Sequence, residues 1–282
     1  MISSTIIISV YKDIDNLELI LDSLSTQTLL PNEIIISEDG NSEEMSTFVQ
    51  KMKNKHTKLN IIHIFQDDIG WRKNRALNNA IVTATSEYLI FIDGDCIPYS
   101  KFIEAHVNNA KENVVLCGKR MELGERYSKL IKQRKLKVSD IEKNFFLILP
   151  KLIIDKTNHL EDGIPLSNGN FIYKLLKKRY VRHIIGCNFS CFKDDFIKIN
   201  GFNEDFINPS EGEDVDPSWR FRAKGVELVS CRLIANIAHI YHEKRFNHEI
   251  GEINRKIMYK NMEDNISFCK NGLDKYLSKE QK

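Results

Sequence analysis

The sequence lacks any long hydrophobic run and any strong excess of one charge. No apolar stretch approaches the roughly 20 residues that a bilayer-spanning helix needs. The 282 residues carry a net charge of only +2, which is too small to indicate general nucleic-acid binding. Residues 1–11 run directly into an apolar segment, without the basic start and cleavage site of a signal peptide. We therefore expect a cytoplasmic protein that binds no nucleic acid and spans no membrane.

Several short motifs are also missing. The six cysteines include one close pair, Cys187 and Cys191, but its spacing does not suggest a zinc site. We expect all six to be reduced thiols in a cytosolic protein. No glycine-rich dinucleotide fingerprint follows the first apolar segment, and no phosphate-binding P-loop motif is present, which argues against a dehydrogenase or a P-loop enzyme.

The first part of the chain alternates apolar strands with amphipathic helices. Hydrophobic residues make up 42% and charged residues 28% of the sequence, as is typical of a soluble globular protein. Such β-α-β-α alternation predicts a parallel sheet covered by helices, with the strand ends at one rim. In the first predicted helix, Asp15 or Asn16 can cap the start. The predicted strands are 5–10, 33–37, 60–65 and 89–92, and the predicted helices with clear bounds are 15–25 and 74–85.

Beyond Gly124 the pattern changes. Residues 129–137 are strongly basic, and the apolar run 145–154 is interrupted by Pro150. Residues 160–170 are typical of a loop, and residues 174–182 are basic again. A second organised block follows at 183–245, and residues 252–282 are predicted to be helical. The chain shows no internal repeats and no low-complexity tracts.

Polar residues follow three of the predicted strands, where ligands of open α/β sheets bind. Tyr11 follows the first strand, Asp39 the second, and Asp93 and Asp95 the fourth. Two carboxylates at a strand end suit a divalent cation that bridges two phosphates. Aspartate and glycine are also ordinary turn residues, so a simple turn is the alternative at 93–95.

Two adjacent cations, Arg72 and Lys73, precede the helix 74–85. They could neutralise phosphate charge. The alternative is a solvated basic helix start that has no ligand.

The second block carries another acidic cluster and a pair of histidines. The cluster lies just before a predicted helix at 219–223, and four acids within six residues exceed what helix capping requires. A carboxylate in such a loop could act as a general base. His239 and His242 follow an apolar run and are either structural or metal ligands. The four acids are Glu211, Glu213, Asp214 and Asp216.

Taken in order, these motifs resemble bacterial family 2 glycosyltransferases, which have the GT-A fold. The resemblance covers nearly all of residues 3–245 and rests on IIISVYKD, IIISEDGN, DIGWRKNRALNNAI, FIDGDCIP, GCNFSCFKDDFIKINGFNEDF, GEDVDPSWRFRAKG and HIYH. The second block is similar to the C-terminal region of galactosyltransferase-like and chondroitin-polymerase-like enzymes. Two departures stand out: PSEGED replaces the usual W-G-G-E-D loop, and Glu38-Asp39 replaces two aspartates.

The resemblance implies a role for each matching residue. Residues at the strand ends are implied to bind the donor nucleotide and a Mn²⁺ or Mg²⁺ ion, and residues of the second block to bind the sugar and carry the chemistry. His242 matches the metal-binding histidine better than His239. The implied set is Tyr11, Asp39, Arg72 and Asp93 for the nucleotide, Asp95 and His242 for the metal, Asp214 as base, Glu213 for the acceptor, and Gly186 and Asn188 for the sugar pocket.

The resemblance also implies an α/β fold of GT-A type. This is a Rossmann-like, mostly parallel mixed sheet flanked by helices, forming one compact unit of two abutting subdomains. Residues 1–124 are implied to bind the donor and residues 125–182 to form a variable acceptor-side insertion. Residues 183–245 are implied to carry catalysis and the acceptor, and residues 246–282 to form a helical tail.

The implied reaction is inverting, metal-dependent transfer of a sugar from a nucleoside diphosphate, with UDP expected, to a hydroxyl of a growing surface glycan such as capsule or lipopolysaccharide. One alternative is a sugar nucleotidyltransferase, which needs a glycine- and arginine-rich loop where this chain reads YKDIDN. The other is a non-catalytic carbohydrate-binding relative, which has no need to keep Asp95, Asp214 and His242 together.

Basic clusters bracket an apolar patch in the middle segment, residues 125–182. KLIKQRKLK and KLLKKRY flank the apolar run 145–154. This arrangement suits contact with a lipid-linked glycan or with the inner face of the membrane. The alternative is a core helix with solvated lysines.

Overall fold

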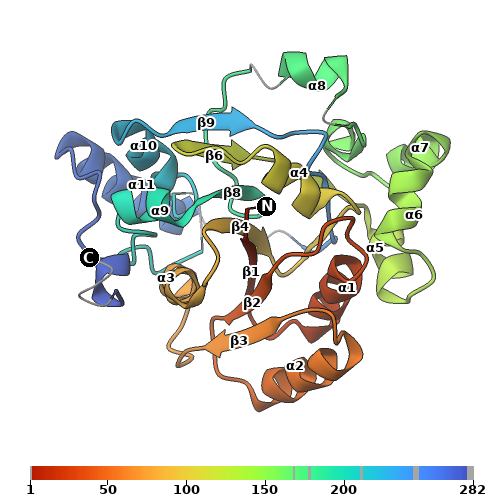
Figure 1. The fold of residues 1–282 in the computed structure, drawn as a ribbon, viewed down its shortest axis with the longest axis horizontal. Coiled ribbons are helices and arrows are strands. Elements are labelled where there is room, and N and C mark those ends of the chain that lie inside the picture. The colour runs from red at the N-terminus through yellow and green to blue at the C-terminus, as the bar shows by residue number, and fades with distance from the viewer. Residues whose placement is uncertain (1, 168, 177–178, 210–211, 244–247, 278–282) are drawn as a thin grey trace.

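A mixed sheet of seven strands forms the centre of the computed structural model, which describes residues 2–167, 169–176, 179–209, 212–243 and 248–277 (Figure 1). The strand order is β3-β2-β1-β4-β8-β6-β9. The first four strands are parallel, whereas β8 runs antiparallel to both β4 and β6. The bounds are β1 Ser4–Val10, β2 Glu33–Glu38, β3 Ile61–Phe65, β4 Tyr88–Asp93, β6 Val114–Cys117, β8 Phe189–Phe192 and β9 Glu227–Ser230.

Helices cover both faces of the sheet because its central strands are apolar on both sides. In β1, Ile6 and Ile8 pack into the same core as α1 (Ile14–Leu24) and α2 (Glu43–Lys55). Ile7 points to the opposite face and packs with α3. Figure 1 shows α1 and α2 on one side of the sheet and α3, α9 and α10 on the other. The second group has the bounds α3 Lys73–Thr83, α9 Lys193–Lys198 and α10 Asp216–Ala223.

The predicted parallel, helix-covered sheet is confirmed, and two local predictions are wrong. Helix α1 is capped by Asp13, not by Asp15 or Asn16, because the Asp13 carboxylate accepts the backbone N–H of Asn16 at 3.0 Å. The C-terminal helix α11 (His248–Glu263) ends well before residue 282. After it, the described chain turns back and forms the short 3₁₀ helix Leu273–Lys275, whose Leu273 is buried in the core.

A second, small sheet joins the two halves of the chain. It contains β5 (Cys96–Pro98), β10 (Ile237–His239) and β7 (Met121–Glu122) in the order β5-β10-β7. β5 and β10 pair antiparallel, with His239 opposite Cys96. This register places the end of β10 beside the turn that follows β4.

The described residues of the middle segment form four α-helices at the periphery (Figure 1). The predicted interruption at Pro150 is wrong, because α7 continues through the proline. Part of the predicted loop at 160–170 is a 3₁₀ helix, Leu160–Gly163. Among the described residues, no helix has both the length and the apolar character needed to cross a bilayer. The four helices are α5 Glu125–Lys132, α6 Val138–Lys143, α7 Phe145–Ile154 and α8 Phe171–Leu176.

Candidate active site

A cleft of about 400 Å³ opens at the carboxyl ends of β1, β2 and β4. Strand β1 lies between β2 and β4, and the crossover helices on its two sides cover opposite faces of the sheet. The strand ends therefore form a switch point where ligands of α/β sheets bind. The lining includes the predicted residues Tyr11, Asp39, Asp93 and Asp95, together with Lys73.

Asp39 occupies the floor of the cleft between two donors. Its Oδ1 accepts a hydrogen bond from Gln66 Nε2, and its Oδ2 accepts one from the backbone N–H of Arg72, both at 2.7 Å. Tyr11 is half exposed above it, with its hydroxyl donating to Asp68 at 3.2 Å. Each Asp39 oxygen keeps a free lone pair for a ligand donor.

Of the two cations that the sequence offered, Lys73 lines the described cleft, whereas the family resemblance had selected Arg72. The Arg72 guanidinium donates to the Trp71 carbonyl at 2.7 Å, and Arg72 is not among the residues that line the described cleft. Lys73 Nζ donates to Asp93 Oδ1 at 2.6 Å. Burial lowers the pKa of Lys73, but the charges of Asp93 and Glu213 outweigh it, so the pKa lies above its ordinary value. Lys73 therefore stays charged.

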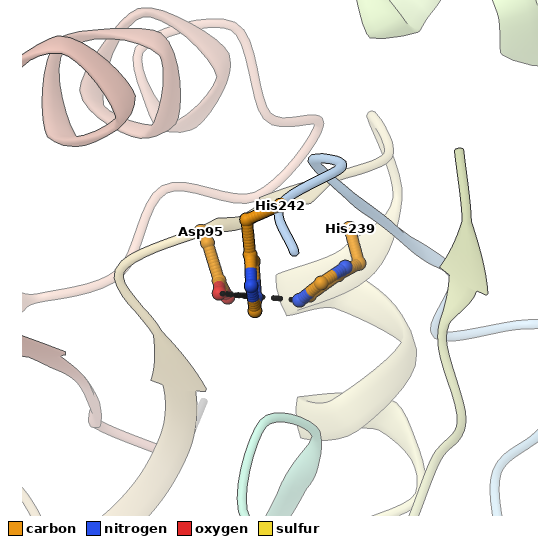
Figure 2. Close-up of side chains that lie close together, drawn as sticks. All are labelled: Asp95, His239 and His242. Carbon is orange, nitrogen blue, oxygen red and sulfur yellow. Dashed lines mark ion pairs between the residues drawn. The ribbon is translucent and has the colours of Figure 1, made fainter. Parts of the chain in front are cut away.

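Asp95 meets both histidines at the end of the cleft (Figure 2). His239 Nε2 lies 3.1 Å and His242 Nε2 3.3 Å from Asp95 Oδ2. Burial raises the pKa of Asp95, but the hydrogen bonds from the two imidazoles prevail and hold it well below its usual range. The family resemblance had favoured His242 over His239. The β5–β10 pairing also brings in His239, which is buried while His242 is exposed.

These three side chains fit a divalent cation. Their ligand atoms lie within 4.8 Å of one another. Neighbouring ligands bound about 2.1 Å from one ion lie roughly 3 Å apart, which matches the Asp95–histidine distances. A mixed set of one carboxylate and two imidazoles suits Mn²⁺ and other first-row ions better than Ca²⁺.

A second acidic pair lies near Lys73 in the loop before α10, although neither acid is among the residues that line the described cleft. Asp214 Oδ2 accepts the backbone N–H of Gly186 at 3.2 Å. A Cβ at Gly186 would lie 3.2 Å from the Asp214 Cβ and 3.8 Å from Lys73 Nζ, so the approach requires a very small residue. Within the described part of the chain, Glu213 Oε2 is buried and has no hydrogen-bond partner. The Asp214 and Glu213 carboxyls therefore lie near Lys73 and contribute to its electrostatic environment.

Burial raises the pKa of both acids of this pair. For Glu213, burial followed by the charge of Asp214 raises the pKa to about 8, against the opposing effect of Lys73. For Asp214, burial also raises the pKa, while the hydrogen bond from Gly186 opposes it. A raised pKa makes a carboxylate a better proton acceptor near neutral pH.

The other residues of the sequence-predicted site have structural partners or are not described. Asp216 is buried and pairs with Arg220 at 2.6 Å, which indicates a structural role at the start of α10. Asn188 is fully buried, and its amide donates to the carbonyls of Lys119 and Ala235, so it supports the loop instead of lining the described cleft. Glu211 lies outside the described residues.

The raised pKa of Glu213 predicts a pH-dependent stability. The Glu213 carboxyl has a pKa of about 8 in the folded state, against an ordinary value near 4.5. Its contribution to the stability of the folded state is therefore complete at acid pH, where the carboxyl is protonated. That contribution is lost as pH rises toward and through 8. Glu213→Gln should therefore have a higher free energy of unfolding than the unmodified chain, and this difference should be larger at pH 8.5 than at pH 5. Urea denaturation at both pH values measures this, with exposed Glu227→Gln as control. A difference independent of pH would contradict it.

Solved structures with the same architecture define the fold. A mannosyltransferase from Pyrobaculum calidifontis in complex with GDP-Man and Mn²⁺ superposes with a TM-score of 0.56 at 15% identity, over 87% of this chain and 59% of that one. GalNAc-T7 with UDP, GalNAc and Mn²⁺ gives 0.62 at 12% identity, over 92% and 48%. S. aureus TarS gives 0.54 at 14% identity, over 92% and 39%. The fold is the GT-A fold of glycosyltransferases.

The chain belongs to glycosyl transferase family 2, which it matches over residues 5–199. Residues 169–243 also match the N-terminal domain of galactosyltransferase. Chondroitin synthase of Pasteurella multocida is 27% identical over 241 residues, which are 79% of this chain and 23% of that protein. Validoxylamine A glucosyltransferase of Streptomyces hygroscopicus subsp. limoneus is 23% identical over 238 residues, 81% and 49%. The chain thus spans less than half the length of each of these two relatives.

Proposed function

We propose that this protein transfers a sugar from a nucleoside diphosphate, with UDP as the expected nucleotide, to a hydroxyl of a growing surface glycan, inverting the anomeric configuration. The observation that carries the proposal is the position of Lys73. It contacts Asp93 at the strand end and lies within the field of Glu213 and Asp214, so one cation connects the candidate donor site with the candidate base. Family membership supports glycosyl transfer, and two solved structures with the same fold contain a nucleotide or a nucleotide sugar together with Mn²⁺.

In this proposal the first strands bind the nucleotide. Tyr11 contacts the nucleobase, and the free lone pairs of Asp39 accept its imide N–H. Asp93 contacts the ribose, and Lys73 neutralises the diphosphate. Gln66 orients Asp39 through its hydrogen bond. Arg72 contributes its backbone N–H to the same carboxylate.

Asp95, His239 and His242 would hold Mn²⁺ or Mg²⁺ beside the diphosphate. A divalent ion there supplies Lewis-acid stabilisation of charge on the departing nucleotide. The protein's part is to fix three ligands: Asp95 directly before β5, His239 at the end of β10 and His242 shortly after it. The pairing of β5 with β10 holds the two segments side by side.

Asp214 acts as the general base. It removes the proton from the acceptor hydroxyl as that oxygen bonds to the anomeric carbon, while the bond from that carbon to the diphosphate oxygen breaks on the opposite face. This single displacement inverts the configuration. Glu213 binds the acceptor, and the absence of a side chain at Gly186 leaves room beside Asp214 and Lys73.

A thermal-shift screen of nucleotide sugars in Mn²⁺ tests the proposal. A ligand that binds the folded state raises its stability according to its concentration and affinity. We expect one UDP-sugar to stabilise the protein only when Mn²⁺ is present. Stabilisation by a nucleoside triphosphate with a sugar phosphate, and by no nucleotide sugar, would instead favour a nucleotidyltransferase. Stabilisation by free glycans alone would favour a binding module.

The adjacent cations provide a matched pair of variants. We expect Lys73→Gln to weaken nucleoside diphosphate binding by roughly 10-fold or more, the scale of one lost charge-assisted hydrogen bond. Arg72→Gln should have a clearly smaller effect, because its guanidinium bonds to the Trp71 carbonyl. Calorimetry in Mn²⁺ measures both affinities, and circular dichroism confirms that both variants fold. Equal losses, or a larger loss for Arg72→Gln, would contradict the assignment of Lys73.

A further inference from the structure

Helix α7 is apolar on both its inner and its outer face. Phe145 and Leu152 point inward and are buried in the core. Leu147 and Ile154 point outward and are 80% and 78% exposed, with Phe146 and Ile153 exposed beside them. Large contiguous apolar surfaces of this kind mark interaction sites in soluble proteins.

Helix α8 repeats the pattern. Tyr173 anchors it in the core, while Phe171, Ile172 and Leu175 are exposed. A cavity of about 460 Å³ lies between the end of α6 and the segment that precedes α8, and its lining includes Lys143 and Asn170. We call the outer side chains of both helices the apolar surface, which consists of Phe146, Leu147, Ile153, Ile154, Phe171, Ile172 and Leu175.

The segment that carries the apolar surface is strongly basic. Residues 125–182 contain 14 lysines and arginines and 6 aspartates and glutamates, a net charge of +8, whereas the whole chain has +2. The remaining residues therefore have a net charge of −6. Lys143 and Lys151 are exposed beside the apolar side chains of α7, and Lys174 beside those of α8.

We propose that the apolar surface docks on an anionic lipid bilayer. Its apolar side chains would enter the boundary between headgroups and acyl chains, and the surrounding lysines would contact the anionic headgroups. The charge argues against a second copy of this chain as the occupant, because two segments of +8 would face each other. The inference does not depend on the proposed function, since it concerns a surface formed by other residues than the cleft.

Vesicle co-sedimentation of the full chain, without nucleotide or metal, tests the proposal. We expect binding to phosphatidylglycerol-containing vesicles at least about tenfold stronger than to pure phosphatidylcholine, because each basic residue near an anionic surface contributes about fivefold. Added salt should weaken this binding. Equal binding to both kinds of vesicle, or binding to neither, would overturn the proposal.

Two charge-introducing variants locate the contact. Leu147→Glu and Ile154→Glu should each weaken binding to the anionic vesicles by about tenfold or more, because each removes an inserted apolar side chain and adds a repelled charge. Ile253→Glu on α11 is the matched control: the residue is also exposed but lies outside the basic segment. All three variants should keep the melting temperature of the unmodified chain. Unchanged vesicle binding by both α7 variants would overturn the proposal. A parent chain that binds no vesicles, and instead forms a dimer in sedimentation velocity that Leu147→Glu dissociates, would overturn it as well.

Discussion

Asp95→Ala is expected to abolish metal-dependent binding of the nucleotide. Asp95 Oδ2 is the atom to which both His239 and His242 converge, and it supplies the negative charge of the trio. Loss of a supporting contact around a metal ligand already lowers metal affinity by about 10- to 100-fold, so loss of this ligand should cost at least that much. Calorimetric titration of UDP in Mn²⁺ measures the effect.

Asp68→Ala is the matched control for this experiment. Asp68 lines the same cleft and carries the same charge, but it pairs with the exposed Lys12 and lies outside the trio. We expect it to retain most of the Mn²⁺-dependent affinity. Unchanged UDP affinity in Asp95→Ala would exclude the trio as the metal site.

Asp214→Asn should leave donor binding intact while transfer falls by about 100-fold or more, the scale of a lost general base. The asparagine oxygen can still accept the N–H of Gly186, so the local structure is retained while the proton acceptor is lost. Steady-state transfer kinetics and calorimetry of the donor, performed on the same preparation, separate the two quantities.

Two neighbouring acids make this test specific. Glu213→Gln should raise the KM for the acceptor more than it lowers turnover, since Glu213 is assigned to acceptor binding. Asp216→Asn should reduce the stability of the fold, because it breaks the buried pair with Arg220, while the folded fraction keeps its turnover. If Asp214→Asn retains turnover and Glu213→Gln does not, Glu213 is the base.

The donor half of the fold could be predicted because its physical signals are local. Strands β1, β2 and β4 are apolar runs buried on both faces, whereas the edge strand β3 is only partly buried. The polar residue after each run marks the sheet edge where ligands bind. Tyr11, Asp39, Asp93 and Asp95 were found by this rule and line one cleft. The same rule could also have found Gln66, which directly follows β3 and donates to Asp39.

The rest depends on contacts that a sequence pattern does not contain. β5, β7 and β10 have three, two and three residues, which is too short for any periodicity. Their pairing nevertheless places His239 beside Asp95, 144 positions earlier in the chain. Arg72 and Lys73 are adjacent cations, and only the exact start of α3 decides which one enters the cleft. Asn188 was assigned to the sugar pocket because its segment resembles a family motif, but its side chain is buried in this fold.

The central claim is that the cleft cleaves a nucleotide sugar and transfers the sugar. Incubation with a panel of UDP-sugars in Mn²⁺, followed by NMR of the released sugar and the nucleotide, tests it most directly. We predict that one donor yields UDP together with a sugar product of inverted anomeric configuration, and that chelation of Mn²⁺ stops the reaction. Nucleotide sugars that bind but remain intact, or release of a retained anomer that persists in the Asp214→Asn variant, would contradict the account.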